Sequence, residues 1–199
     1  MTLKIHSICV YCGSADHLHP DYLSAAEEFG ATLARAGIRM IYGAGKTGLM
    51  GAVADGVLRA GGEVIGVVSE NLNTPQLIHA HLTQLEVVPD IQLRKARMSA
   101  LADAFIALPG GYGTLDELFE TLTWVQIGLH QKPVGLLNIR NYFDPLLAMI
   151  QKAHDEGFIY AEHKMLFIHD TSPTSLLDRL CAFEIPENLN RWLSRKDPD

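Results

Sequence analysis

Three glycine-bearing segments hold the residue types from which a phosphate-binding site could be built. They are Cys12-Gly13-Ser14, Gly43-Ala44-Gly45-Lys46-Thr47-Gly48 and Pro109-Gly110-Gly111-Tyr112-Gly113-Thr114. Glycine lets backbone amides come close to a phosphate, and the start of a helix adds partial positive charge. Tight turns between a strand and a helix also need glycine, so one such segment alone indicates no more than a turn. Three of them at one edge of a sheet indicate a ligand that bears a phosphate.

Ionisable residues that could act on such a ligand follow the third segment and precede it. Glu117 could serve as a general base or stabilise a developing cation. However, Thr114-Leu115-Asp116-Glu117 also fits a capping box, in which Glu117 bonds back to the amide at the helix start, and the residues alone favour this cap. Arg94, Lys95 and Arg97 have the spacing of a solvated helix face, which is their ordinary interpretation.

The second segment imitates two nucleotide-binding motifs. Gly45-Lys46-Thr47 looks like the end of a Walker A loop, but Met40 stands where the earlier glycine is required. Gly43-x-Gly45-x-x-Gly48 does match the dinucleotide fingerprint, with Glu70 near the end of the next expected strand. That fingerprint normally follows the first strand of its unit, and here it follows the second. An NAD(P)-dependent enzyme is therefore an alternative that leaves the segment 109–114 without a role.

Alternating apolar runs and amphipathic runs predict the elements that position these segments. We expect strands at 5–11, 38–42, 64–68, 85–88, 104–108, 134–137 and 165–168, and helices at 20–36, 49–60, 91–101, 115–129, 142–156 and 173–182. Apolar strands separated by helices predict one doubly wound, Rossmann-like α/β domain with a mostly parallel sheet flanked by helices. It would span 1–185, before a polar tail at 186–199. Ligands of such sheets bind beyond the carboxyl ends of the strands, where all three glycine segments fall.

Composition narrows the classes of partner. The 199 residues carry a formal net charge of -7, which disfavours a nucleic-acid partner. No apolar run approaches the length of a membrane span, and no signal peptide begins the chain, so we expect a cytoplasmic protein without a membrane partner. The scattered histidines and cysteines indicate neither a metal site nor a disulfide framework. Cys9 and Cys12 are three residues apart on an expected strand, which predicts that they face opposite sides.

Taken together, these segments resemble the Lonely Guy (LOG) family of cytokinin riboside 5′-monophosphate phosphoribohydrolases, many of which carry the label lysine decarboxylase. The family signature Pro-Gly-Gly-x-Gly-Thr-x-x-Glu is matched by Pro109, Gly110, Gly111, Gly113, Thr114 and Glu117. Further matches are Cys12-Gly13-Ser14, the run 48–55, Arg94-Lys95-x-x-Met98 and Thr123-Trp124-x-Gln126-x-Gly128, so that the resemblance spans 8–158. Gly43-Ala44-Gly45 stands where a triple glycine is usual, and Gln92-Leu93 where Met-His is usual. A decarboxylase would commonly need a Schiff-base lysine for pyridoxal phosphate, and no lysine stands out.

The resemblance implies hydrolysis of the N-glycosidic bond of AMP or an N6-modified AMP, without a cofactor or a metal. It implies that Glu117 and Arg94 are catalytic. The substrate-binding residues would be Gly13, Ser14, Gly43, Gly45, Lys95, Met98, Gly110, Gly111, Gly113 and Thr114. It further implies a homodimer that packs partly through the apolar run 118–129. A non-catalytic nucleotide-binding protein, such as a carrier or a sensor, remains an alternative, as does the NAD(P)-dependent enzyme.

Overall fold

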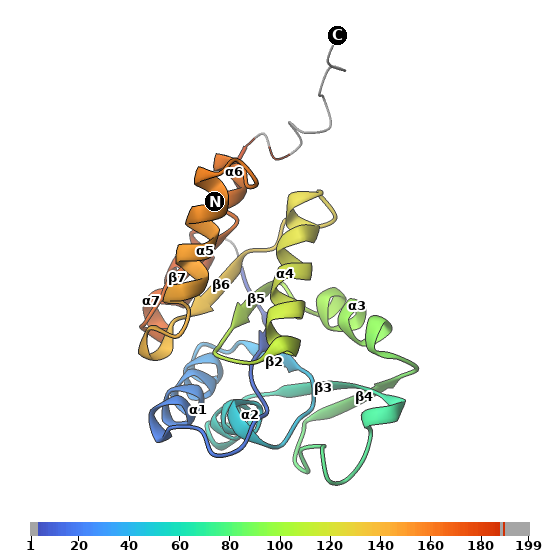
Figure 1. The fold of residues 1–199 in the computed structure, drawn as a ribbon. Helices are drawn as coiled ribbons and strands as arrows, with labels where there is room; N and C mark the ends of the chain where they lie inside the picture. Colours follow the sequence, from blue (N-terminus) through green and yellow to red (C-terminus); the bar gives the residue numbers. More distant parts are fainter. Residues whose placement is uncertain (1–3, 188, 190–199) are drawn as a thin grey trace.

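The computed structural model describes residues 4–187 and 189, and its centre is a seven-stranded sheet. The strand order is β4-β3-β2-β1-β5-β6-β7, and every pair of neighbours is parallel (Figure 1). The strands are β1 Ser7–Tyr11, β2 Arg39–Tyr42, β3 Val64–Ser69, β4 Gln84–Val88, β5 Ala104–Ala107, β6 Val134–Leu137 and β7 Phe167–Asp170. This arrangement confirms the predicted doubly wound α/β fold.

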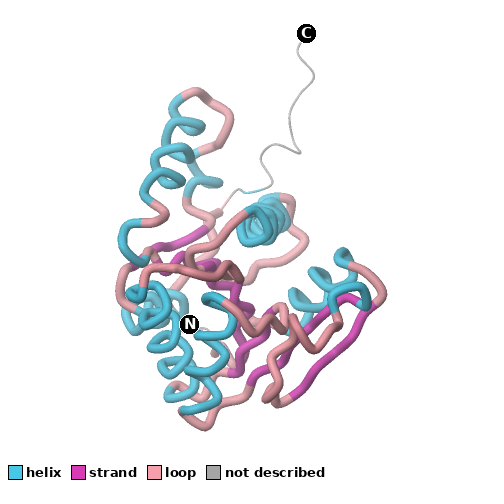
Figure 2. Tube along the Cα trace, turned by 60° about the horizontal axis from the view of Figure 1, so that its bottom comes forward, coloured by secondary structure: helices cyan, strands magenta, loops and turns pink. Residues whose placement is uncertain are grey.

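Helices cover both faces of the sheet, because a parallel sheet must bury both of its sides (Figure 2). The helices α1 Pro20–Arg35, α2 Gly48–Arg59 and α7 Pro173–Cys181 pack on one face. The helices α3 Ile91–Leu101, α4 Tyr112–Gln126 and α5 Asp144–Asp155 pack on the other, with the short α6 Ala161–Lys164 beside α5. Cys12 belongs to the first core and Cys9 to the second, as the strand spacing predicted. No helix within residues 4–187 is long and apolar enough to span a membrane.

The strand order reverses at β1, which has β2 on one side and β5 on the other. The segments that follow β1 and β5 therefore leave the sheet side by side, and the amide of Gly13 donates a hydrogen bond to the carbonyl of Pro109 at 3.0 Å. A reversal of this kind opens a crevice beyond the carboxyl ends of the strands. The fold thus brings the first and third glycine segments together at the position where such sheets bind ligands.

Most element boundaries fall within two residues of the prediction, and α4 is the informative exception. It begins at Tyr112, with Gly111 as its N-cap, and not at 115. The start of α5 also moves, from 142 to Asp144, because Arg140 and Asn141 have φ values of 53° and 59° and belong to the short helix η2 Ile139–Asn141. The short helices α6 and η1 Glu70–Leu72 were not predicted. Most of the predicted tail at 186–199 lies outside the described residues.

Gly48 shows how tightly the loop after β1 packs against the start of α2. Its φ is +58°, and a Cβ there would lie 2.6 Å from the carbonyl oxygen of Ala15. We expect Gly48→Ala to lower the free energy of unfolding in urea by at least about 2 kcal/mol, since left-handed backbone strain and a backbone clash add together. Gly61 is the matched control, because its φ is +78° but a Cβ would meet nothing within 4 Å. Gly61→Ala should cost only about 1 kcal/mol, and equal losses in both variants would contradict the packing argument.

Candidate active site

A cavity of about 710 Å³ opens at the carboxyl ends of the central strands. Its volume lies in the usual range for sites that bind small molecules. Of the residues predicted to act on or bind a substrate, ten line it: Gly13, Ser14, Gly43, Gly45, Arg94, Gly110, Gly111, Gly113, Thr114 and Glu117. The fold therefore collects side chains from α3 and α4 and backbone from all three glycine segments around one space.

The segment from Pro109 to Thr114 has an asymmetric pattern of hydrogen bonds. Its carbonyl groups are engaged by the protein: that of Pro109 accepts from the Gly13 amide, that of Gly110 from the Tyr142 hydroxyl, and that of Gly111 from the Leu115 amide. Within the described chain, by contrast, the consecutive amides from Gly110 to Thr114 donate to no protein acceptor. A Cβ on Gly111 or Gly113 would meet no atom within 4 Å, so the space beside them is open to a ligand. Consecutive free amides at a helix start form the arrangement that binds phosphate.

The start of α2 lacks this property. The carbonyl oxygen of Gly13 accepts hydrogen bonds from the amides of Leu49 at 2.9 Å and Met50 at 3.2 Å, and thereby caps the helix. The hydroxyl of Thr47 donates to the carbonyl of Ser14 at 2.7 Å and holds the same loop in place. A dinucleotide fingerprint needs the first amides of its helix for the pyrophosphate. Here the protein itself occupies them, which argues against the NAD(P)-dependent alternative.

The glycines of the second segment make room for side chains. A Cβ on Gly45 would lie 2.8 Å from the sulfur of Met50, and one on Gly43 would lie 1.6 Å from Nη2 of Arg94. Gly43 is therefore the residue whose small size lets the Arg94 guanidinium reach the cavity.

Replacing Gly43 by alanine should displace that guanidinium while the fold is retained. A shift of about 1 Å in a positioned group can cost roughly 100-fold in rate, so we expect a loss of that order in kcat/KM for the reaction proposed below. Gly135→Ala is the matched control: Gly135 lies in β6, away from the cavity, and its Cβ would meet only side chains at 3.2 Å or more. Steady-state kinetics and thermal unfolding of both variants test this, and equal activities would show that the Arg94 position is unimportant.

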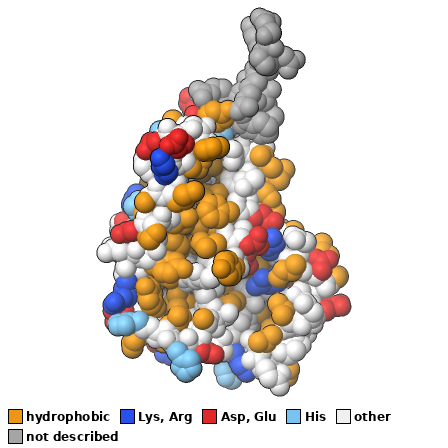
Figure 3. Space-filling view, in the orientation of Figure 1, with side chains coloured by type: hydrophobic (Ala, Val, Ile, Leu, Met, Phe, Trp, Pro, Cys, Tyr) orange, Lys and Arg blue, Asp and Glu red, His pale blue; other side chains and the backbone are white. Residues whose placement is uncertain are grey.

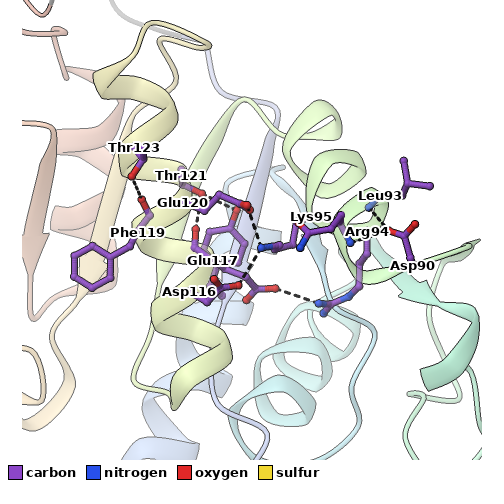
Figure 4. A network of polar contacts seen from close by, with 12 residues as sticks. Asp90, Leu93, Arg94, Lys95, Asp116, Glu117, Phe119, Glu120, Thr121 and Thr123 are labelled. Atoms are coloured by element: carbon purple, nitrogen blue, oxygen red, sulfur yellow. Dashed lines mark hydrogen bonds and ion pairs between the residues drawn. The ribbon is translucent and has the colours of Figure 1, made fainter.

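Arg94 on α3 and Glu117 on α4 point toward each other (Figure 4), and both line the cavity. Asp90 caps α3 by accepting from the amides of Gln92 and Leu93, which fixes the turn that carries Arg94. Nε of Arg94 donates to the carbonyl of Val67 at 3.0 Å, and Nη1 lies 3.2 Å from Oε1 of Glu117. Both side chains are only 12% exposed. The capping-box interpretation of Glu117 is wrong, because α4 starts three residues before Leu115 and the carboxylate points to Arg94.

Burial sets the protonation of this pair. Removal from water raises the pKa of Glu117 to about 7, although the charge of Arg94 acts in the opposite direction. A carboxyl group with a pKa near neutral pH is suited to exchange a proton during a reaction. Its position in the cavity and its raised pKa make Glu117 a candidate for acid–base chemistry.

Two predicted substrate-binding residues do not line the cavity. Nζ of Lys95 lies 3.0 Å from carboxylate oxygens of both Asp116 and Glu120, beside the Arg94–Glu117 pair (Figure 4). Burial lowers the pKa of Lys95, but these two carboxylates outweigh it, so the net shift is upward. Met98 is buried in the core beneath α3. We therefore include neither Lys95 nor Met98 among the substrate contacts, and Arg97 likewise turns away, to Glu86.

Several residues that line the cavity belong to no motif recognised in the sequence. Tyr142 reaches it from the connection between β6 and α5, and Leu72, Leu77 and Ile78 reach it from the connection between β3 and β4. The second connection is held against the loop after β2, where the Lys46 amide donates to Leu77 at 3.0 Å. The one available signal was the group of apolar residues in a segment without strand or helix periodicity.

Sequence similarity to known proteins extends over most of this chain. The family model described as possible lysine decarboxylase matches residues 50–180. The probable cytokinin riboside 5′-monophosphate phosphoribohydrolase LOGL3 of Oryza sativa subsp. japonica is 44% identical over 86% of this chain and 82% of the rice protein. The phosphoribohydrolase LOG7 of Arabidopsis thaliana is 43% identical over 91% and 83%, respectively.

Solved structures show how widely the fold occurs. The molybdenum cofactor binding protein of Rippkaea orientalis superposes with a TM-score of 0.69 at 23% identity, covering 91% of this chain and 98% of that one. The molybdenum cofactor carrier protein of Chlamydomonas reinhardtii gives 0.67 at 21%, covering 90% and 100%. At these identities the likeness concerns the fold alone. The sequence relatives decide the family: the chain belongs to the Lonely Guy (LOG) family of cytokinin riboside 5′-monophosphate phosphoribohydrolases.

Proposed function

We propose that this protein hydrolyses the N-glycosidic bond of AMP or an N6-modified AMP and releases the free base and ribose 5-phosphate. The observation that carries the proposal is the buried Arg94–Glu117 pair in the same cavity as the unclaimed amides from Gly110 to Thr114. The relatives named above carry this activity in their names. The amides would hold the phosphate, and Glu117, in the second turn of α4, would face the sugar.

The chemistry follows from the charges. As the bond between C1′ and the base nitrogen breaks, its electron pair leaves with the base and positive charge develops on the ribose. The Glu117 carboxylate stabilises that charge and takes a proton from the water whose oxygen bonds to C1′. The departing base takes up a proton from solvent, and Glu117 later returns its proton to solvent, so that the net change is the addition of one water molecule. Arg94 keeps a larger fraction of Glu117 ionised, because its charge lowers the pKa that burial raises.

The opposite wall of the cavity suits an adenine-type base. Leu72, Leu77 and Ile78 present apolar side chains there, and Met50 and Val68 extend the same lining. Flat, weakly polar rings bind well to such surfaces. We therefore expect the phosphate to bind at the start of α4 and the base to lie against the connection between β3 and β4.

Incubation with AMP, with isopentenyladenosine monophosphate and with adenosine tests the activity directly. We expect free base from at least one of the two nucleotides and far less from the nucleoside, because only the nucleotides bear the phosphate. Chromatography of the base and of ribose 5-phosphate in equal amounts is the measurement. Tight nucleotide binding by a folded protein with no base release would overturn the hydrolase and favour the carrier or sensor alternative.

We also propose that the protein is a homodimer that packs through α4. The exposed fractions of Phe119, Ile127 and Leu129 are 44%, 42% and 67%, and Met149 on α5 is 63% exposed. Figure 3 shows apolar side chains gathered over α4 and α5. Contiguous apolar surface of this kind is typical of subunit interfaces.

Phe119→Asp should therefore convert the dimer to a monomer, because an unpaired carboxylate would be buried at the interface. Light scattering after size-exclusion chromatography measures the mass. Leu85→Asp is the matched control, since Leu85 is 39% exposed, close to the 44% of Phe119, but lies on the edge strand β4. A wild-type monomer, or dissociation by Leu85→Asp alone, would contradict this interface.

A further inference from the structure

Tyr142 connects two distant parts of the site. Its hydroxyl donates a hydrogen bond of 2.5 Å to the carbonyl oxygen of Gly110, although the two residues belong to different β–α connections. The ring also lines the cavity and packs edge-on against Tyr22, with 6.3 Å between ring centroids. The contact thus links the residues just before α5 to the segment 109–114, whose amides donate to no protein acceptor within the described chain.

The carbonyl that Tyr142 binds belongs to the peptide between Gly110 and Gly111. Because this peptide is trans, its carbonyl and the amide of Gly111 point in opposite directions. Glycine on both sides lets a peptide unit rotate with little steric cost. A rotated unit would direct a carbonyl oxygen, and not an N–H group, at a phosphate. A hydrogen bond that holds the Gly110 carbonyl in place therefore keeps the Gly111 N–H group, and not a carbonyl oxygen, directed at the ligand.

The two residues before Tyr142 have an uncommon backbone conformation, and this conformation sets the position of the Tyr142 hydroxyl. Arg140 and Asn141 both have left-handed φ values, which cost a non-glycine residue about 1 kcal/mol or more each. Contacts with α1 hold them: Arg140 forms an ion pair with Asp21, and its guanidinium carbon lies 6.0 Å from the Tyr22 ring centroid. The conformation is thus tied to the rest of the fold, and so is the position of the Tyr142 ring.

We infer that Tyr142 is a positioning residue for the substrate phosphate, whose hydroxyl fixes the Gly110–Gly111 peptide with the Gly111 amide presented to the phosphate. The inference rests on the proposed function, because it uses the same phosphate position. It assigns Tyr142 no part in bond cleavage, since in the proposed function the Arg94–Glu117 pair carries that step. Its effect must therefore be specific to ligands that carry the phosphate.

Tyr142→Phe removes the hydroxyl and keeps the ring, so the packing on Tyr22 is retained. In calorimetry, performed in a Glu117→Gln background to prevent turnover, the Kd for AMP should rise about five- to tenfold, the effect of one lost hydrogen bond. The Kd for adenosine should stay within about twofold of its value with Tyr142 present, because no phosphate is involved. In the otherwise wild-type enzyme, KM for AMP should rise by a similar factor while kcat changes less than about threefold.

Tyr42→Phe is the matched control. The Tyr42 hydroxyl also donates to a glycine carbonyl, that of Gly45 at 3.1 Å, but on the loop after β2. It should leave the ratio of the AMP and adenosine affinities unchanged. An unchanged ratio in Tyr142→Phe, whether neither affinity falls or both fall equally, would overturn the role of Tyr142. Absence of base release by the wild type would overturn only the hydrolase, because the binding ratio is measured without turnover.

Discussion

Replacing Glu117 by glutamine is expected to lower kcat for base release at least about 100-fold while the protein remains folded. Glutamine has nearly the same shape and can still accept the hydrogen bond from Arg94, so the buried guanidinium keeps a partner. It carries no charge to stabilise the ribosyl cation and cannot take a proton from water. Base release measured at saturating AMP, beside a thermal unfolding curve, tests the expectation.

The stability of Glu117→Gln at different pH values shows whether Glu117 has a catalytic role or only a structural one. The folded-state pKa of Glu117, about 7, lies above its ordinary value of 4.5. Between these two pH values the folded protein binds more protons than the unfolded chain, so the free energy of unfolding falls as pH rises. Glu117→Gln should lose this pH dependence. A variant that is less stable at every pH but retains normal kcat would mean that Glu117 only holds the fold.

The fold and the third glycine segment could be predicted because both depend on local signals. Strands as apolar as β1 and β5 alternate with amphipathic helices, and few topologies accommodate that pattern. The start of α4 could not be placed correctly, since Tyr112 and Gly113 are poor residues for a first helical turn and Thr114 imitates an N-cap. The contacts of the Pro109 and Gly110 carbonyls outweigh that preference, and they come from Gly13 and Tyr142, which are far away in the sequence.

Two predicted substrate contacts, Lys95 and Met98, do not line the cavity, and the reason is geometric. Arg94 and Lys95 are adjacent in the sequence, and neighbouring residues on a helix point about 100° apart. When Arg94 reaches the cavity, Lys95 must turn towards the flank of α4, where Asp116 and Glu120 bind it. Arg94, Lys95 and Met98 belong to one sequence motif, but only the face of α3 that carries Arg94 lines the cavity. Lys95 and Met98 therefore serve the packing between α3 and the rest of the fold.

Arg94→Ala is expected to lower kcat/KM roughly 100-fold near neutral pH, with a loss that depends on pH in a characteristic way. In the wild type, kcat/KM should rise with pH through an apparent pKa near 7, because the ionised form of Glu117 is the active one. Arg94 lowers that pKa, so its removal moves the rising limb to higher pH. The variant should lose more activity at about pH 6 than at about pH 8, since high pH restores the carboxylate that the guanidinium otherwise helps to ionise.

Arg97→Ala provides the matched control for this pH signature. Arg97 lies on the same helix but pairs with Glu86 outside the cavity, so its removal should leave both the rate and the limb unchanged. If Arg94→Ala lost the same factor at every pH, Arg94 would act on the substrate without affecting the ionisation of Glu117. A loss of activity that becomes smaller as pH rises would instead show that the charge of Arg94 helps to ionise Glu117. A contact between Arg94 and the substrate alone would not change the pKa of Glu117 in the free enzyme.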